Sequence, residues 1–161
     1  MTPFDLLQRH PRAVLLSGPT PVEHLVRLSR RLGVEVFVKR DDLTGLGMGG
    51  NKIRQLEFYL GDALAKGADT LLITGAVQSN YARAAAAAAA KLGLDAVVQL
   101  EERVPGMGRT YYQSGNVLLD DLLGARRLSF PEGENEAGAD QALREEANGS
   151  GSRAAGRMSS P

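Results

Sequence analysis

The sequence predicts an α/β protein: a parallel sheet with flanking helices, arranged in three layers. Two features of the chain predict this fold. A helix-like segment, a glycine and a strand-like segment recur in that order along the sequence. The helix-like segments are also long enough to form the crossover connections that join parallel strands. Because such connections are right-handed and place their helices on the faces of the sheet, we expect βαβ units.

The first element in chain order is an extended arm over residues 1–20. Prolines remove backbone donors and disfavour helix in the residues before them, and four occur in or just after this arm: Pro3, Pro11, Pro19 and Pro21. Thr20 can cap a helix whose apolar face spans residues 22–32 and which ends at Gly33. Residues 34–39 then alternate between apolar and other side chains, which predicts a strand.

The same order recurs three times further along the chain. Helices are predicted over residues 52–66, 79–92 and 113–123, and each ends at a glycine: Gly67, Gly93 and Gly124. The strands that follow are predicted over residues 70–74, 96–100 and 126–130. The second of these helices contains seven consecutive alanines. Alanine favours helix and lets it lie close against a sheet.

After Phe130 the character of the sequence changes. Residues 131–136 are placed to begin one more helix, which runs through Glu146. From Asn148 onward the residues are small and polar without a hydrophobic period, and residues 148–161 are predicted to be a disordered tail. A parallel sheet followed by such a tail predicts that the fold is interrupted and that the rest of the protein is absent from this sequence.

Composition excludes several classes of protein. Nineteen acidic and nineteen basic residues balance, so there is no electrostatic case for nucleic acid or an anionic membrane as partner. The chain has no cysteine and two histidines, so neither disulfides nor a metal site is expected. We also expect no signal peptide, because residues 1–12 have no long apolar core, and no apolar run here approaches the length needed to span a bilayer. We therefore expect a cytoplasmic protein.

A glycine-rich loop, TGLGMGGNKIR (residues 44–54), brings Lys52 to the start of a predicted helix. Glycine lets the backbone of such a loop approach a ligand closely. A lysine amine that is desolvated, or that lies near another cation, becomes a nucleophile toward carbonyl groups. The alternative is a flexible turn followed by an exposed lysine.

Two nucleotide-binding motifs resemble this loop but do not fit it. Gly45, Gly47 and Gly50 spell the dinucleotide motif, but residues 41–44 intervene between the preceding strand and this motif. The phosphate-loop motif places its lysine directly after a glycine and a Ser or Thr after the lysine, whereas Asn51 and Ile53 flank Lys52 here. Nucleotide binding is therefore ranked low.

A second stretch, TGAVQSNY (residues 74–81), follows a predicted strand and opens the next helix. Open α/β sheets bind ligands at this end of their strands, and the unpaired N–H groups of a helix N-terminus suit a carboxylate or phosphate. Ser79 or Asn80 could instead serve only as the helix N-cap. Without Lys52, capping is the preferred interpretation.

Together the two stretches resemble one enzyme family. The segments VKRDDLTGLGMGGNKIRQLEF and GADTLLITGAVQSNYARAAAAAAAKLG are similar to the pyridoxal-phosphate enzymes of the D-cysteine desulfhydrase and 1-aminocyclopropane-1-carboxylate deaminase group. The similarity runs from the N-terminal arm to about Phe130 and rests on the GGNK and QSN motifs in combination. It implies the tryptophan-synthase-β-like fold, the N-terminal half of a fold-type II enzyme, and pyridoxal 5'-phosphate as cofactor.

The resemblance implies roles for four residues. Lys52 matches the lysine that forms the Schiff base with the cofactor. Asn80 matches the asparagine that hydrogen-bonds the cofactor's ring hydroxyl, and Ser79 matches the catalytic serine that contacts the substrate. The backbone of Ser79, Asn80 and Tyr81 matches the turn that receives the substrate carboxylate. Tyr81 departs from the His or Gln expected at its position, so the choice of substrate does not carry over.

The resemblance also implies how the chain is divided. Residues 1–51 correspond to the N-terminal arm and part of the larger cofactor domain, and residues 52–147 to the smaller α/β domain. The family's glycine-rich phosphate loop and the partner of the pyridine nitrogen lie in the second half of its members. The chain is therefore expected to be truncated, and its parent to be a homodimer that acts on a small amino acid.

Two functions stay open at this point. The first is a pyridoxal-phosphate-dependent lyase or deaminase resembling D-cysteine desulfhydrase, which releases a 2-oxo acid and ammonia, with sulfide if the substrate is cysteine. The second is a catalytically inactive fragment or a small-domain binding module.

Overall fold

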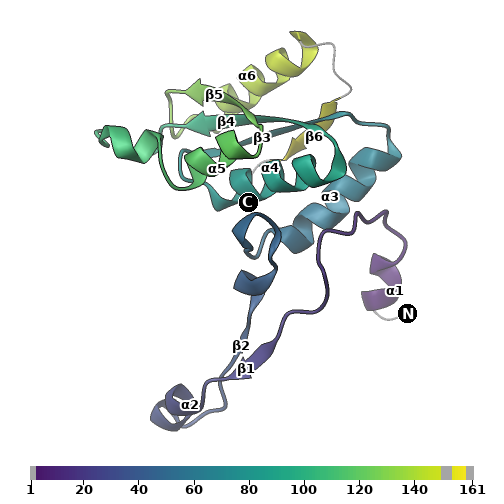
Figure 1. Ribbon diagram of the computed structural model, residues 1–161, viewed down its shortest axis with the longest axis vertical. Coiled ribbons are helices and arrows are strands. Elements are labelled where there is room, and N and C mark those ends of the chain that lie inside the picture. Colours follow the sequence, from purple (N-terminus) through teal and green to yellow (C-terminus); the bar gives the residue numbers. More distant parts are fainter. Residues whose placement is uncertain (1–2, 150–153, 159–161) are drawn as a thin grey trace.

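The computed structural model describes residues 3–149 and 154–158 and contains a four-stranded sheet (Figure 1). The order of its strands is β5 (Arg126–Phe130), β4 (Asp95–Glu101), β3 (Thr70–Ala76) and β6 (Ala154–Met158). Every neighbouring pair is parallel. The strands predicted at residues 70–74, 96–100 and 126–130 are confirmed, and so is their parallel pairing.

Helices cover both faces of this sheet, which confirms the three-layer prediction (Figure 1). One face carries α3 (Ile53–Ala65), α4 (Asn80–Leu92) and α5 (Asn116–Leu122), and the other carries α6 (Glu136–Gly149). Side chains alternate along a strand, so Leu71 and Ile73 of β3 join the core beneath α3 and α4. Leu72 points the opposite way and packs against Leu143 of α6.

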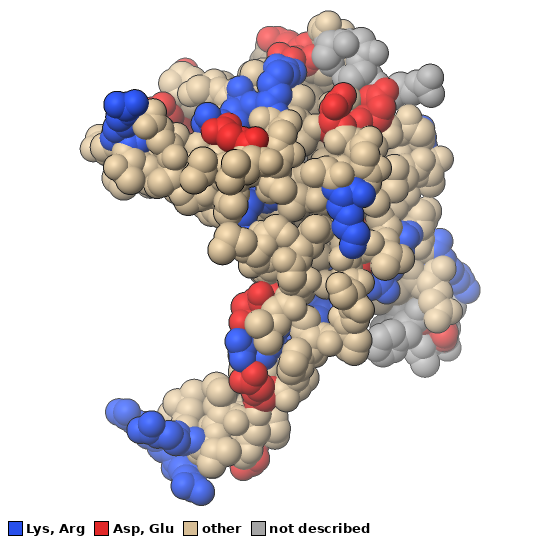
Figure 2. Space-filling model, in the orientation of Figure 1, with Lys and Arg blue, Asp and Glu red and all other residues tan. Residues whose placement is uncertain are grey.

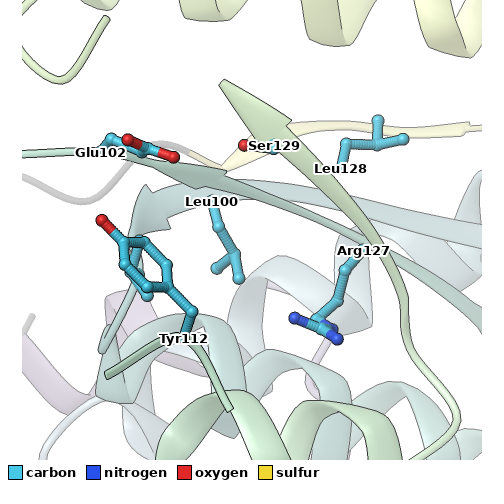
Figure 3. Close-up of a pocket in the computed structure, with 7 residues that line it drawn as sticks. Leu100, Glu102, Tyr112, Arg127, Leu128 and Ser129 are labelled. Carbon is cyan, nitrogen blue, oxygen red and sulfur yellow. The ribbon is translucent and has the colours of Figure 1, made fainter. Parts of the chain in front are cut away.

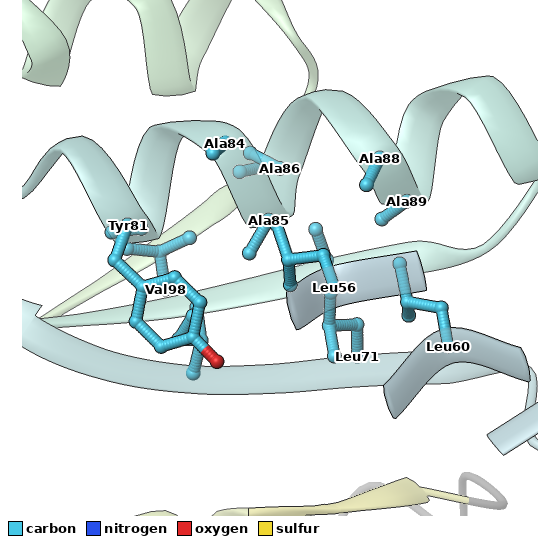
Figure 4. Packing of buried hydrophobic residues seen from close by; sticks show 14 of the residues in the cluster. Leu56, Leu60, Leu71, Tyr81, Ala84, Ala85, Ala86, Ala88, Ala89 and Val98 are labelled. Carbon is cyan, nitrogen blue, oxygen red and sulfur yellow. The ribbon is translucent and has the colours of Figure 1, made fainter. Parts of the chain in front are cut away.

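The alanine run lies in α4, which is buried on nearly all sides (Figure 4). The helix contacts α3, α5 and the strands β3 and β4, and residues 81–89 are all buried. Small side chains allow three neighbours to approach one helix at once. Gly93 ends α4 with a φ of 72°, a left-handed conformation that glycine adopts without strain, as predicted.

The N-terminal part of the chain differs from its prediction. Residues 3–7 form the short helix α1 (Pro3–Leu7) within the expected extended arm, and proline suits a first helical turn. The predicted helix over residues 22–32 is divided into the strand β1 (Val22–His24) and the helix α2 (Val26–Leu32). The predicted strand at residues 34–39 is shorter, as β2 (Phe37–Lys39), and pairs antiparallel with β1. Over residues 22–24, pairing with β2 therefore replaces the helix that the hydrophobic period predicted.

The expected disordered tail is wrong for two of its segments. α6 continues through Gly149, and residues 154–158 form β6, which pairs with β3. Without β6 the backbone groups of β3 would face an open sheet edge. Strand pairing uses backbone groups, so it needs no hydrophobic period in the sequence. The rest of the predicted tail, residues 150–153 and 159–161, lies outside the described residues.

Before Lys52 the chain passes through two short 3₁₀ turns, η1 (Asp41–Leu43) and η2 (Leu46–Met48). A further 3₁₀ turn, η3 (Arg109–Tyr112), precedes α5, whose predicted start at residue 113 is displaced to Asn116. The pair β1–β2 and the helix α2 form an extension that projects from the body, with basic side chains at its far end (Figures 1 and 2). Among the described residues, no helix combines the length and the apolar character needed to cross a bilayer.

Candidate active site

Lys52 lies at the junction between the glycine-rich loop and α3, where it occupies the position just before the first helical residue. Its side chain is half-buried, and the Nζ atom lies 5.5 Å from the centroid of the Tyr81 ring in α4. An ammonium group over an aromatic face is attracted by the negative face of the ring. The structure therefore brings together the two predicted stretches, at the starts of two neighbouring helices.

Lys52 differs from the other three lysines of the chain in its partners. Lys39 donates to the carbonyl of Thr20, Lys91 donates to the carbonyl of Leu15 at 3.0 Å, and Lys66 pairs with Asp62 at 2.6 Å. Lys52 forms no hydrogen bond or ion pair with any described residue. Its amine is thus held in place by the loop and the Tyr81 ring, and it is available to a carbonyl compound.

The glycine-rich loop is held against α4 by Arg83. The guanidinium of Arg83 donates to the carbonyls of Gly47 and Gly49, the latter at 3.1 Å. Gly47 and Gly49 both have positive φ, and a side chain on Gly47 would collide with Ala87. Burial lowers the pKa of Arg83, partly offset by the charge of Asp120. Sequence reasoning missed Arg83, although a charged residue inside an otherwise apolar helix was a usable signal.

A second polar network fixes the other end of the loop to α3. Arg54, two residues after Lys52, donates to both carboxylate oxygens of Asp41 at 2.9 Å and to the hydroxyl of Thr20 at 2.8 Å. The hydrogen bonds from Arg54 lower the pKa of Asp41 to about 2. Thr44 closes the loop on itself, because its hydroxyl donates to the Gly50 carbonyl and accepts from the Gly50 N–H. The loop that precedes Lys52 is therefore held by Arg83 of α4, and the first turn of α3 that follows it is held to Asp41 by Arg54.

Ser79 is the N-cap of α4, which agrees with the simple capping interpretation. Its hydroxyl oxygen accepts a hydrogen bond from the N–H of Ala82 at 3.2 Å. A hydroxyl that accepts still has its own proton to donate, so capping does not exclude contact with a ligand. The first N–H groups of a helix lack partners within it. Here the amides of Asn80 and Tyr81 remain without a described partner.

Asn80 faces the glycine-rich loop. A Cβ placed on Gly50 would lie 3.6 Å from the amide nitrogen of Asn80, so the two stretches nearly touch here. The Asn80 side chain is exposed and forms no hydrogen bond with a described residue. Lys52 and Asn80 thus flank the same junction, each with a polar group that lacks a protein partner.

Tyr81 is buried in the core rather than exposed to a ligand, with 1% of its surface accessible. Its hydroxyl has no hydrogen-bond partner among the described residues, and burial raises the pKa of the phenol. The ring itself lies beneath the Lys52 amine. The Tyr81 side chain is therefore closed to a substrate.

Gln78 fixes the turn before α4 to the segment that leads into α5. Its side-chain amide donates to the carbonyls of Tyr111 at 2.6 Å and Ser114 at 2.9 Å, and it accepts from the N–H of Asn116 at 3.0 Å. Both donor positions of the side-chain amide and its carbonyl oxygen are thereby used. Gln78 is a positioning residue that the sequence motif contained but did not assign.

These residues fit the aldehyde end of the cofactor that the resemblance implies. The unpaired Lys52 amine suits an aldehyde carbon, and the unpaired Asn80 amide suits the neighbouring ring hydroxyl. The free amides at the start of α4 suit a carboxylate, because they lie at the positive end of the helix dipole. The chemistry of the donor set therefore matches the predicted site.

A family model described as pyridoxal-phosphate dependent enzyme matches residues 14–158. A D-cysteine desulfhydrase from Klebsiella pneumoniae subsp. pneumoniae is 55% identical over 116 residues, which are 72% of this chain and 35% of that protein. A D-cysteine desulfhydrase from Salmonella paratyphi B is 52% identical over 120 residues, or 74% of this chain and 37% of that protein. The chain spans about a third of the length of these curated relatives.

Solved structures give the same picture of the fold. A crystal structure described as an ACC deaminase homologue is 40% identical with a TM-score of 0.82, and the match covers 99% of this chain and 48% of that chain. The crystal structure of an O-ureido-L-serine synthase, at 24% identity, has a TM-score of 0.66 over 84% of this chain and 40% of that chain. The second likeness concerns the fold alone.

Proposed function

The chain belongs to the family of pyridoxal-phosphate-dependent enzymes, in the fold of their fold-type II members, and from this premise we propose the reaction of the whole protein. It is a lyase or deaminase of the D-cysteine desulfhydrase type, which converts a small amino acid to a 2-oxo acid and ammonia. With D-cysteine as substrate, sulfide leaves as well. The observation that carries the proposal is the Lys52 amine, which has no polar partner among the described residues and lies beside the start of α4.

Lys52 and Asn80 are the proposed cofactor ligands. Lys52 would hold the cofactor through its amine, and the same nitrogen can accept and return the substrate's α-proton. The Asn80 amide would donate a hydrogen bond to the ring hydroxyl of the cofactor. The Tyr81 ring lies against the amine and excludes water from that side. When bound, the cofactor supplies the electron sink for the reaction.

Ser79, Asn80 and Tyr81 are the proposed substrate ligands. The backbone N–H groups of Asn80 and Tyr81 are placed to receive the substrate carboxylate at the start of α4. The Ser79 hydroxyl keeps its proton while it caps the helix, so it can donate to the substrate as a catalytic group. Gln78 holds this turn in place through the segment before α5.

The proposal extends to the organisation of the whole protein. Residues 52–147 form its smaller domain, and residues 1–51 join an arm to the larger cofactor domain. The whole protein works in the cytoplasm as a homodimer on a small amino-acid substrate. These points rest on the family resemblance.

The 161-residue chain by itself is expected to bind the cofactor weakly and to turn over D-cysteine negligibly. The proposed contacts reach the aldehyde and the ring hydroxyl, whereas the cofactor's phosphate is a dianion that requires several backbone amide donors. An inactive fragment or a binding module is the alternative function, and it predicts that no added segment restores activity.

A chimera separates these two functions. Residues 1–130 are joined to the complementary C-terminal part of the Klebsiella D-cysteine desulfhydrase, and sulfide release from D-cysteine is measured. We expect activity that Lys52→Ala abolishes and that Lys66→Ala, a matched control on an exposed lysine, leaves intact. A folded chimera that binds the cofactor but releases no sulfide would contradict the proposed reaction.

A further inference from the structure

A pocket of about 310 Å³ lies at the carboxyl ends of β4 and β5, on the face of the sheet that carries α4 and α5 (Figure 3). Its wall combines apolar side chains with charged and hydroxyl groups. The main lining residues are Val77, Leu100, Glu102, Tyr112, Arg127 and Ser129. None of the four residues proposed to contact cofactor or substrate lines it.

The two charged residues lie at opposite ends of this pocket. The register pairs Leu100 with Ser129 and Val98 with Arg127, so Glu102 and Arg127 are offset by four residues along neighbouring strands. At the rise of a β-strand this offset is about 13 Å. Figure 3 shows Leu100 between Glu102 and Arg127, with the Tyr112 ring below Glu102. The pocket therefore has a carboxylate at one end, a guanidinium that is ion-paired with Asp121 at the other, and apolar side chains between them.

Both charged groups retain hydrogen-bonding capacity. The Glu102 carboxylate forms no hydrogen bond or ion pair with a described residue. Arg127 donates to Asp121 through Nε at 2.5 Å, and its two terminal nitrogens have no hydrogen bond to a described residue. The hydroxyls of Tyr112 and Ser129 also form no hydrogen bond with a described residue. These groups can therefore bind a ligand without breaking a described contact.

We propose that this pocket binds an extended zwitterion, an ω-amino acid whose ammonium meets Glu102 and whose carboxylate meets Arg127. The methylene chain lies along Leu100, Val77 and the Tyr112 ring. An α-amino acid with an uncharged side chain carries its ammonium and carboxylate on the same carbon and cannot reach both ends of the pocket. The proposal is independent of the cofactor chemistry, because it uses none of the residues assigned to that site.

The test measures binding of 6-aminohexanoate to the 161-residue chain by titration calorimetry. Hexanoate, hexylamine and glycine serve as comparison ligands, since each lacks one charge or the separation between the charges. We expect 6-aminohexanoate to bind more tightly than all three. Glu102→Gln and Arg127→Gln each weaken its binding by about tenfold, the usual effect of losing one charge-assisted contact.

Matched controls use charged residues away from the pocket. Glu134→Gln, Arg144→Gln and Lys52→Ala leave the binding of 6-aminohexanoate unchanged. Glu102→Lys reverses the charge at one end, so this variant prefers adipate, a dicarboxylate of the same length. Circular dichroism shows whether each variant is folded, and the Glu102 variants test the proposal even if Arg127→Gln does not fold.

Three results would overturn the proposal. The first is equal binding of 6-aminohexanoate, hexanoate and hexylamine, or no binding at all. The second is unchanged binding in both Glu102→Gln and Glu102→Lys. The third is loss of binding in Lys52→Ala, which would place the ligand at the Lys52 site instead.

Discussion

The body of the protein and the segment that precedes Lys52 are held in place by different forces. In the body, strands and helices share an apolar core in which Leu56 and Leu71 are fully buried. The segment before Lys52 includes an extension whose apolar residues are largely accessible, such as Leu32 and Phe37, each 58% exposed. Ala13 and Leu15 of the arm are part of the apolar core, whereas polar contacts of Arg54 and Arg83 join the glycine-rich loop and the turn before it to the body. The difference shows that apolar packing builds the scaffold, whereas polar contacts position the lysine.

Two buried carboxylates illustrate this difference. Glu57 of α3, where the N-terminal arm meets the body, accepts hydrogen bonds from the N–H groups of Leu15 and Leu16 and from Arg12. Burial alone would raise the pKa of Glu57, but these three donors together hold it below its usual value. Asp120 lies inside the body with no hydrogen bond to a described residue, and burial raises its pKa to about 7.

The largest effect on stability is expected in the apolar core. Leu56→Ala should lower the free energy of unfolding by about 3 kcal/mol, because it removes buried methyl groups and leaves a cavity. Leu32→Ala makes the same chemical change on the exposed extension and should cost less than about 0.5 kcal/mol. Urea unfolding of both variants measures the difference. Equal losses would mean that the extension is as firmly packed as the body.

A smaller and local effect is expected at the polar junction. Glu57→Gln should cost about 2 kcal/mol, since the neutral amide binds Arg12 and the two N–H groups less well. Amide hydrogen exchange at Leu15 and Leu16 should accelerate while exchange in β3 stays slow. Glu134→Gln, an exposed control, should leave both unchanged. Uniform acceleration throughout the sheet would contradict a local role.

The same difference explains which elements of the fold could be predicted from the sequence. Helices, closing glycines and the three central strands of the body followed from local hydrophobic period, because that period reports burial against a sheet. By contrast, β1 lies in a stretch with a helical hydrophobic period and β6 in a stretch without any hydrophobic period, so neither strand has such a local signal.

The candidate site shows the same limit. Lys52, Ser79 and Asn80 were found from motifs, and the structure places their two stretches side by side. The burial of Tyr81 and the loop contacts of Arg83 were not predicted. Arg83 reaches carbonyls 34 and 36 positions away, so its role depends on tertiary packing rather than on neighbouring residues.

A further expected effect on stability depends on pH. Because the pKa of Asp120 is about 7 in the folded protein and near 4 in an unfolded chain, the folded state binds more protons between these values. Stability should therefore fall as the pH rises through this range, by about 1 kcal/mol between pH 5 and pH 6. Asp120→Asn should remove this dependence, which urea unfolding at several pH values measures. A slope that persists in the variant would assign the titration to another group.

The central claim is that the structure singles out one amine for carbonyl chemistry. The most direct measurement mixes the chain with pyridoxal 5'-phosphate, reduces the mixture with borohydride and maps the modified peptides by mass spectrometry. We expect the pyridoxyl group on Lys52 before it appears on Lys39, Lys66 or Lys91, which already have hydrogen-bond or ion-pair partners. Lys52→Arg should lose this label and Lys91→Arg should keep it. Label spread evenly over the four lysines, or placed first on another of them, would contradict the claim.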